Sequence, residues 1–105
     1  MSATVDVRRG AVYLPRALVD AHFAAVDAVV VLVRDGRLLI LPVSHAGAGG
    51  CLLKLRNSAG DRVAVAADVF AAHGLADLDL RDAPAVWAPE LAALCIALPD
   101  TDAAN

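Results

Sequence analysis

Three histidines and two cysteines are the residues best suited to catalysis or metal binding, and their spacing favours neither. His45 and Cys51 bracket a glycine-rich segment, but a cysteine nucleophile needs a base that a third group holds in place, and no third group is identifiable. His22 and His73 occupy matching positions in two predicted helices, yet a zinc site needs three or four ligands. A histidine near a helix end is the ordinary alternative, because it interacts favourably with the helix dipole. We therefore expect no enzyme activity, no metal and no cofactor.

Two further patterns resemble ligand-binding loops only superficially. Gly47-Ala-Gly49-Gly50 leads into a predicted strand, whereas nucleotide-binding loops open a helix and have a different glycine spacing. Asp77, Asp79 and Asp82 alternate with apolar residues and lack the glycine and distal glutamate of a calcium loop. The glycines therefore predict a linker, the aspartates predict an exposed strand face, and no small-molecule substrate is evident.

Basic residues form one candidate binding surface, for DNA or for an acidic partner. They belong to two predicted hairpins, and if these hairpins pair, all five charges converge on one side, where they could contact phosphates. The alternative is a solvated hairpin edge, where positive charge blocks unwanted strand pairing. An isoelectric point near 5.4 and a single lysine argue against DNA, since nucleic-acid-binding domains are usually basic overall. The five residues are Arg8, Arg9, Lys54, Arg56 and Arg62.

Trp87 is the only tryptophan and lies in an alanine-rich neighbourhood. Two interpretations stay open for it. It either fills the core, or it anchors a protein partner, because interfaces favour tryptophan.

The elements that position these residues follow the same order before and after the glycine-rich segment. Period-2 alternation and β-branched runs predict strands, Pro15 suits the first turn of a helix, and Gly74 suits a helix end. Asp35-Gly36 predicts a type I′ hairpin turn, which needs positive φ at both residues. The predicted strands are 5–8, 11–14, 29–34, 37–42, 52–56, 62–65, two separate pieces at 78–80 and 86–87, and 94–98; the predicted helices are 15–23 and 66–73.

This order predicts an internal repeat within a single domain, 1–105. A shift of 51 places Val12–Pro15 on Val63–Ala66 and His22 on His73, and both halves end in Leu-Pro. We expect a first unit at about 1–43, a linker at 44–50, a second unit at about 51–99 and a short tail at 100–105. Units of about 45 residues rarely enclose a core alone, so we expect neither half to fold separately.

The segment Val12-Tyr-Leu-Pro15, the helix from Arg16 and the segment Asp35–Pro42 resemble the AbrB/MraZ-like swapped-hairpin superfamily. The resemblance covers nearly the whole chain if the second half is a degenerate copy, although Ala66 stands where that motif has proline. It implies a mainly β fold with two short helices, a small swapped-hairpin β-barrel built from two pseudo-symmetric ββαββ units. It also implies a DNA-binding transcriptional regulator. The expected core contacts join Leu14, Val19 and Ile40 to Val65, Phe70 and Ile96.

Composition points to a different use of the surface. Hydrophobic residues make up 59% of the chain and the mean hydropathy is +0.62, above the usual share of about half for a soluble domain. A 105-residue domain has little interior, so we expect some apolar surface at an interface with another protein or a second copy. Residues 1–62 hold eight of the nine Lys/Arg against five Asp, whereas residues 63–105 hold one Arg against seven acids. We expect the two ends of the chain to differ in electrostatics.

The remaining expectations concern location and function. The strongest apolar run, Ala28–Val33, is far shorter than the about 20 residues that cross a bilayer, and charged residues and Pro15 interrupt any signal peptide. Two cysteines without a disulfide pattern are typical of the reducing cytoplasm. We expect a non-catalytic protein-interaction or accessory scaffold module of a larger assembly or homo-oligomer, without a membrane partner. The alternative is an AbrB/MraZ-like DNA-binding regulator.

Overall fold

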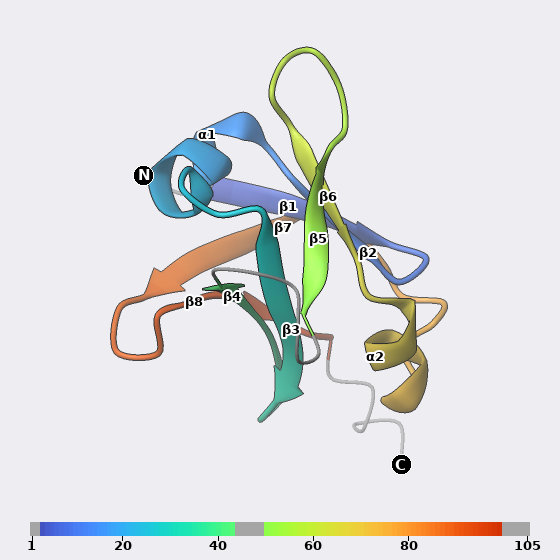
Figure 1. The fold of residues 1–105 in the computed structure, drawn as a ribbon. Coiled ribbons are helices and arrows are strands. Elements are labelled where there is room, and N and C mark those ends of the chain that lie inside the picture. The colour runs from blue at the N-terminus through green and yellow to red at the C-terminus, as the bar shows by residue number, and fades with distance from the viewer. Residues whose placement is uncertain (1–2, 44–49, 100–105) are drawn as a thin grey trace.

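The computed structural model describes residues 3–43 and 50–99 of the 105-residue chain, and strands dominate them. Short loops join the strands in antiparallel hairpins, and two short helical segments interrupt the series (Figure 1). The strands are β1 (Ala3–Arg8), β2 (Ala11–Leu14), β3 (Ala28–Arg34), β4 (Arg37–Val43), β5 (Cys51–Leu55), β6 (Arg62–Val65), β7 (Asp79–Ala88) and β8 (Ala93–Ala97); the helices are α1 (Arg16–Leu18) with its π-helical continuation η1 (Val19–Phe23), and α2 (Ala67–Ala72).

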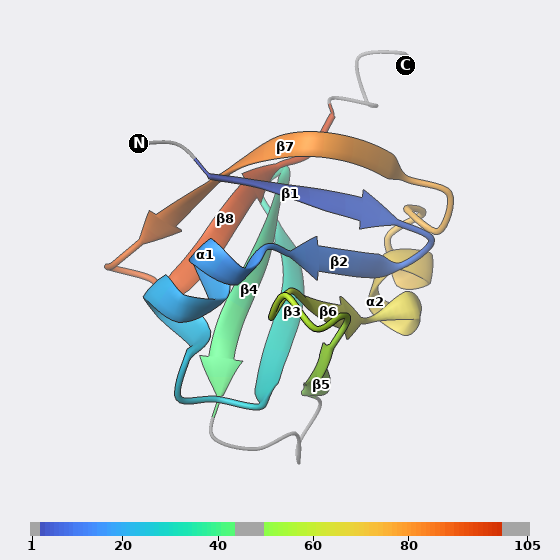
Figure 2. The ribbon, with the colours of Figure 1, turned by 90° about the horizontal axis from the view of Figure 1, so that it is seen from above.

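The strands of the described chain close into one antiparallel barrel. Their order around it is β1-β2-β6-β5-β3-β4-β8-β7, and β7 pairs with β1 to complete the circle. Seen from above, β7 and β1 cross the top of the barrel while β3, β4 and β8 run beneath them (Figure 2). Closure leaves no long sheet edge exposed, which removes a common route to aggregation. The mainly β fold with two short helices is therefore confirmed, as an eight-stranded barrel.

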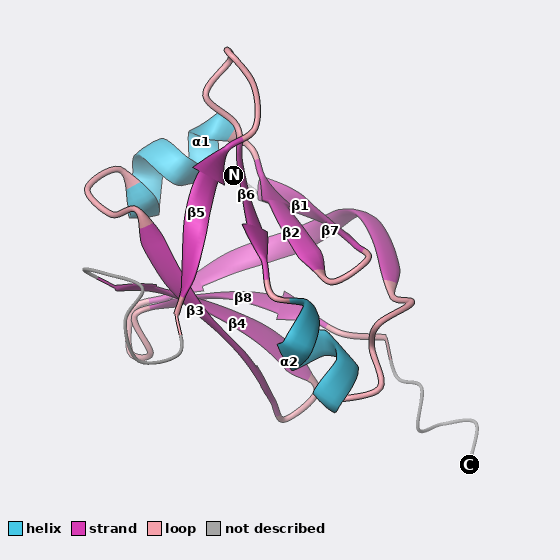
Figure 3. Cartoon of the chain, turned by 45° about the vertical axis from the view of Figure 1, so that its right-hand side comes forward, coloured by secondary structure: helices cyan, strands magenta, loops and turns pink. Residues whose placement is uncertain are grey.

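Each hairpin lies between strands from distant parts of the sequence. The hairpin β1-β2 is flanked by β7 and β6, and the hairpin β3-β4 is flanked by β8 and β5. The helices occupy different ends of the barrel (Figure 1, Figure 3). The segments α1 and η1 lie at the end where a loop joins β5 to β6, and α2 lies beside the opposite end of β6.

The hydrophobic core lies inside the barrel and consists of the inward-facing side chains of the strands. Alternate residues of β4, Leu38 and Ile40, are fully buried, as are Leu94 and Ile96 of β8. Phe70 of α2 and Phe23 of η1 close the interior from the two helices. Of the six residues expected to make core contacts, five belong to this cluster. The exception is Val65, which is 52% exposed. The expectation for Val65 is wrong because Ala64, its neighbour on β6, takes the inward position.

The shift of 51 between the two halves does not describe the strands. It aligns Val12 with Val63, but Val12 is fully buried, whereas Val63 neighbours the inward Ala64 and therefore faces outward. Across β2 and β6 the register pairs Val12 with Ala64 instead. A slip of one residue reverses the face of every side chain in a strand, so an alignment by letters alone is off by one here.

The local predictions agree with the structure at the turns and fail at β7. Asp35 and Gly36 have φ of 54° and 73°, as a type I′ turn requires. The two extended pieces predicted at 78–80 and 86–87 form one ten-residue strand that runs through Pro84. The register between β1 and β7 shifts between Ala83 and Leu80, and there the Asp6 carboxylate accepts a hydrogen bond from the backbone N–H of Asp82, which has a φ of 53°.

Residues 44–49 and 100–105, which hold most of the predicted linker, His45 and the tail, lie outside the described residues. Within the described ranges, no helix is both long enough and apolar enough to cross a membrane.

Candidate functional site

Tyr13 is the centre of the basic surface. Its ring lies on the outer side of β2, and the guanidinium carbons of Arg8 and Arg56 each lie 4.7 Å from the ring centroid. Arg8 comes from β1 on one side of β2, and Arg56 follows β5 on the other side. Lys54 faces the same way, because the register joins it to Val63 and Val63 to Tyr13. An arginine against an aromatic ring gains a cation–π interaction and is held in a fixed orientation.

Two of the five predicted basic residues stand apart from this cluster. Arg9 occupies the β1-β2 turn with a φ of 52°, beside Arg8. Arg62 points to the other side of the sheet, where its Nη1 donates to the Leu53 carbonyl at 3.2 Å and lies 3.9 Å from Asp27 Oδ1. The expected convergence of all five charges is therefore wrong for Arg62, because Arg62 and Tyr13 occupy opposite phases of the strand alternation.

Acidic residues are interleaved with this basic surface. The register places Arg8 directly opposite Asp79 on β7, and Asp6 directly opposite Tyr13. A shallow hollow of about 380 Å³ has Arg8, Arg9 and Arg81 beside Asp77 and Asp79 in its wall. The predicted separation of charge between the two ends of the chain is thus wrong in space, since β1 and β7 are neighbours in the barrel.

Asp61 joins the loop after β5 to the start of α1. The Asn57 side-chain amide donates to one carboxylate oxygen at 3.0 Å, and the backbone N–H of Arg16 donates to the other at 2.9 Å. These two hydrogen bonds, with the charge of Arg56, lower the pKa of the Asp61 carboxyl below its ordinary value. The residue at the N-cap of α1 is Pro15, which makes no side-chain capping hydrogen bond. The Asp61 carboxylate therefore accepts the hydrogen bond of the first N–H of the helix, that of Arg16.

Trp87 lies at the end of the barrel beneath η1. The His22 imidazole stacks on the indole with centroids 4.3 Å apart and planes 6° apart, and the Phe23 ring meets it edge-on at 6.2 Å. The indole is half-buried and packs against the core. His73 follows α2, at the other end of the barrel from η1 (Figure 3). The described residues contain no group of three or more His, Cys, Asp or Glu that could hold a metal ion.

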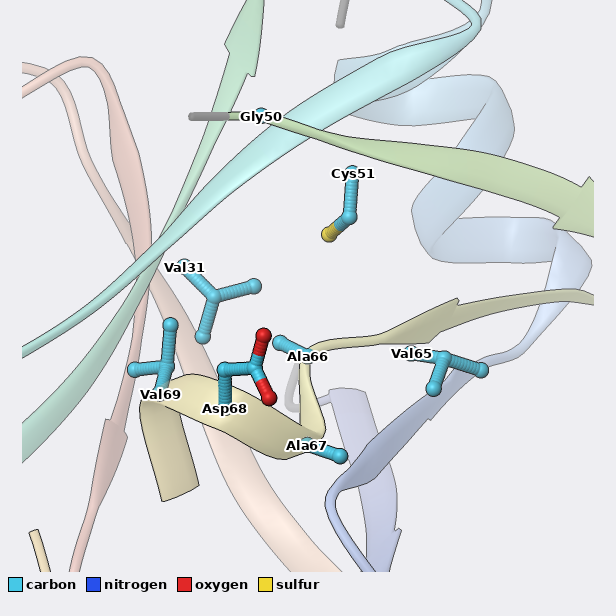
Figure 4. Close-up of a pocket in the computed structure, with 8 residues that line it drawn as sticks. All are labelled: Val31, Gly50, Cys51, Val65, Ala66, Ala67, Asp68 and Val69. Atoms are coloured by element: carbon cyan, nitrogen blue, oxygen red, sulfur yellow. The ribbon is translucent and has the colours of Figure 1, made fainter. Parts of the chain in front are cut away.

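Cys51 borders a groove of about 440 Å³ beside α2. The Cys51 thiol, the Asp68 carboxylate and the Val31 side chain point toward this space, while Val65 lies off to one side (Figure 4). Burial raises the pKa of the Cys51 thiol, so the thiolate that a nucleophile requires is disfavoured. The residues that line the groove include no histidine, and Asp68 is the one carboxylate among them.

The outer side of β3, β4, β8 and β7 carries apolar side chains across its full width. One row across the four strands consists of Leu32, Leu39, Cys95 and Val86, as the registers of the three strand pairs show. Each of these residues lies between inward neighbours, so each points away from the core. Val86 at one edge is 66% exposed and Leu32 at the other edge is 38% exposed, whereas Leu39 between them is 3% exposed and the outward Ala93 is fully buried. We call this surface the apolar face; its flanking outward residues include Val30, Leu41, Ala93, Pro84 and Ala97.

Opposite charges border the apolar face at two ends. Arg34 and Arg37 are paired across the β3-β4 hairpin, beside Ala97, whereas Glu90 occupies the β7-β8 turn. A hollow of about 430 Å³ lies between them along β7 and β8, and both Arg37 and Glu90 line it with Val86 and Cys95. Among the described residues, no carboxylate lies within 4 Å of either arginine and no cation lies that close to Glu90.

Sequence reasoning missed both Tyr13 and the apolar face. Strand alternation could have assigned Tyr13 to the outer side of β2, together with Arg8 on β1, but the approach of Arg56 depends on the pairing of β2 with β6. The apolar face needs four strands from both halves of the chain, so no single segment displays it. No model of a protein family, no curated protein and no solved structure gives a significant match to this chain.

Proposed function

We propose that this protein is a non-catalytic interaction module that binds a protein surface through its apolar face. The observation that carries the proposal is Val86 on β7, an apolar side chain that is 66% exposed beside a hollow of about 430 Å³ along β7 and β8. Exposed apolar side chains that polar residues surround are a common feature of protein-interaction sites. Alternate positions on these strands would be polar if this side of the barrel faced only water.

Size sets the strength of such an interaction. Four strands about 4.8 Å apart and three outward positions along each give a projected area of about 400 Å². At about 25 cal/mol per Å², covering this area yields at most about 10 kcal/mol, because Leu39 and Ala93 are already buried, and association costs about 4–15 kcal/mol. The surplus is small. The module therefore binds weakly through this face unless charged groups at its rim add to the affinity.

A matched pair of valine substitutions tests the proposal. Val86→Asp places a charge in the apolar face, and Val65→Asp makes the same change at a valine of similar exposure elsewhere on the barrel, 52% against 66%. A partner that wild-type protein and Val65→Asp both bind, and that Val86→Asp does not, supports the proposal; native cell extract and the purified protein itself are both tried as partners. Equal behaviour of the three proteins in both experiments would refute it.

We further propose that the barrel is a duplicated swapped-hairpin fold. The support is the pairing pattern: each half contributes two hairpins, and every hairpin is flanked only by strands of the other half. A shift of 52, which places Val12 on its own cross-strand partner Ala64, also aligns the buried Leu18 with the buried Phe70. Both cysteines are free thiols, which supports a reducing compartment such as the cytoplasm.

A DNA-binding regulator is the second candidate, and the cluster around Tyr13 favours it. Arg8, Arg56 and Lys54 point outward together, as phosphate contacts require. Asp6 and Asp79 beside them oppose it. Changing Arg8, Arg9 and Arg56 to alanine should weaken binding to all duplexes alike and reduce its salt dependence, because phosphate contacts do not read sequence. Wild-type protein that shifts no duplex even at low salt would exclude this candidate.

A further inference from the structure

We propose that the hollow between the β1-β2 turn and the start of β7 binds a small ligand through an oxyanion, a phosphate or carboxylate group with a hydrogen-bond donor close to it. The hollow has a volume of about 380 Å³, which is within the range of small-ligand pockets, about 300–1,000 Å³. Figure 2 shows the β1-β2 turn beside α2 and beside the loop that leads into β7. The hollow shares no lining residue with the hollow along β7 and β8, so this inference does not depend on the apolar face.

The β1-β2 turn breaks a local conformational preference at Arg9. Arg9 and Gly10 have φ of 52° and 76°, so both central residues adopt the positive φ that a type I′ turn requires. Asparagine, aspartate and glycine adopt this conformation most readily, and the β3-β4 turn has Asp35 at the same position. An arginine there costs free energy, and strained positions of this kind concentrate where a side chain has a function.

The same turn is held in a fixed position by the start of α2. The backbone N–H of Ala66 donates a hydrogen bond to the Gly10 carbonyl at 2.8 Å. Gly10 also lies so close to Ala67 that an added Cβ would be 2.8 Å from the Ala67 Cα. The Arg9 backbone is therefore fixed at the wall of the hollow, which reduces the entropy lost when its side chain binds a ligand.

Arg8 brings a second guanidinium with unused hydrogen-bonding capacity to this hollow. Its register partner is Asp79, but the Asp79 carboxylate lies 3.5 Å from Arg81 Nε. The Arg8 guanidinium lies against the Tyr13 ring, and its buried Nε has no hydrogen-bond partner among the described residues. Neither Arg8 nor Arg9 has a carboxylate within 4 Å in the described part of the chain. A bound oxyanion supplies the partner that these residues do not provide.

The composition of the wall selects the class of ligand. The planar fork of an arginine donates two parallel hydrogen bonds to a phosphate or a carboxylate, so Arg8 and Arg9 favour a group of this kind. Asp77 and Asp79 line the same hollow. Their carboxylates repel a continuous phosphate backbone but accept hydrogen bonds from an ammonium or hydroxyl group. A small ligand with an oxyanion and a donor a few bonds apart fits both halves of the wall, and phosphoethanolamine is a probe of this chemistry.

Amide and arginine Nε–H spectra of the isotope-labelled protein test the site. Inorganic phosphate, phosphoethanolamine and acetate are titrated separately at constant ionic strength, with chloride as the blank. We expect saturable shifts of the amides of residues 8–11 and 77–81 and of the Arg8 Nε–H, with a dissociation constant of about 1 mM for phosphate, because a shallow site leaves its charges partly in water. Phosphoethanolamine should bind about threefold more tightly. Saturation by acetate and not by phosphate would assign the site to carboxylates, and the reverse result to phosphates.

Arg9→Asn separates ligand binding from folding. Asparagine suits the left-handed turn position, so this variant should unfold at the same or a higher denaturant concentration than wild type, yet bind the anion about fivefold more weakly. Arg8→Gln should weaken binding by a similar factor. The matched control is Arg34→Gln, the same change at the residue before the other hairpin turn, which should bind within about twofold of wild type. Asp77→Asn should remove the advantage of phosphoethanolamine over inorganic phosphate.

Three outcomes would overturn the inference. The first is that neither phosphate nor acetate, at about 20 mM, shifts these signals more than chloride does. The second is that Arg8→Gln, Arg9→Asn and Arg34→Gln all bind the anion as wild type does. The third is that duplex DNA binds more tightly than phosphoethanolamine and that the same arginine variants lose both, because the hollow would then be a DNA contact. Val86→Asp should leave every titration unchanged, so the proposed function is tested separately.

Discussion

Cutting the chain between residues 43 and 51 should produce two fragments that fold only together. The first fragment keeps the hairpins β1-β2 and β3-β4, but these hairpins have no ladder with each other. All of their outer neighbours, β6, β7, β5 and β8, belong to the second fragment. An isolated two-stranded hairpin is marginally stable at best in water, so each fragment alone lacks a sheet that could cover a core.

The strength of reassociation can be worked out from the intact chain. A domain of this size has a free energy of unfolding of about 5–15 kcal/mol. A short linker holds the two halves at an effective concentration of about 1 mM. With the low value of about 5 kcal/mol, the separated fragments should bind with a dissociation constant of about 0.2 µM, and more tightly if the domain is more stable. Mixing them at about 10 µM should therefore restore most of the folded barrel.

Amide spectra of isotope-labelled fragment 1–43 provide the assay. Alone, the fragment should give the narrow amide dispersion of an unfolded chain or the spectrum of a self-paired dimer; with unlabelled fragment 51–105 it should give the dispersed spectrum of the intact protein. A stable folded monomer of 1–43 alone would refute the intertwined pairing. Fragments that stay unfolded when mixed well above 0.2 µM would show that the core estimate is wrong.

Three further predictions concern stability. Phe70 is fully buried, so Phe70→Ala should lower the free energy of unfolding by about 3–5 kcal/mol in a denaturant titration, whereas the exposed His73→Ala should change it by less than about 0.5. Gly10 and Gly36 have φ of 76° and 73°, but only at Gly10 would an added Cβ lie 2.8 Å from a backbone atom, the Cα of Ala67. Gly36→Ala should therefore lower the free energy of unfolding by about 1–2 kcal/mol, and Gly10→Ala should lower it clearly more. Equal losses for the two variants would contradict this reasoning. The pKa of Asp61 is lowered in the folded state, so its contribution to stability is present above the ordinary pKa of 3.8 and is lost as the pH falls through the folded-state pKa. The stability advantage of wild type over Asp61→Asn should therefore shrink below about pH 4 in acid titrations and should not change between pH 6 and 8.

The sequence predicted local structure well where one residue type has one strong preference. Asp35-Gly36 adopts the positive φ values of the predicted turn, and Gly74, with a φ of 70°, ends α2. It failed at Pro84, because a proline in an extended run normally argues against a strand. The run continues as β7 because β1 pairs with it on either side of Pro84, whereas the pairing with β8 begins only at Ala85.

The candidate sites depended more on tertiary structure. The arginines were identified as a group from their charge, but Arg62 left that group because its position on β6 shares the inward phase of Ala64. Tyr13 carried no signal of its own, since its role comes from Arg8 and Arg56 approaching from different strands. Trp87 was left between two interpretations, and its stacking on His22 joins residues that are far apart in the chain.

By itself, the sequence determined the strand and helix periods, the turn positions and the excess of apolar residues, because these follow from local dihedral preferences and from composition. It did not determine which strands are neighbours. Pairing of β1 with β7 mixed the charges that the sequence had separated, and pairing of β3, β4, β8 and β7 assembled the apolar face. Strand register also decided the face of every side chain, since a slip of one residue exchanges inside and outside. Strand neighbours and register are decided only when the whole barrel closes around one core, so the candidate binding surfaces are properties of the tertiary structure.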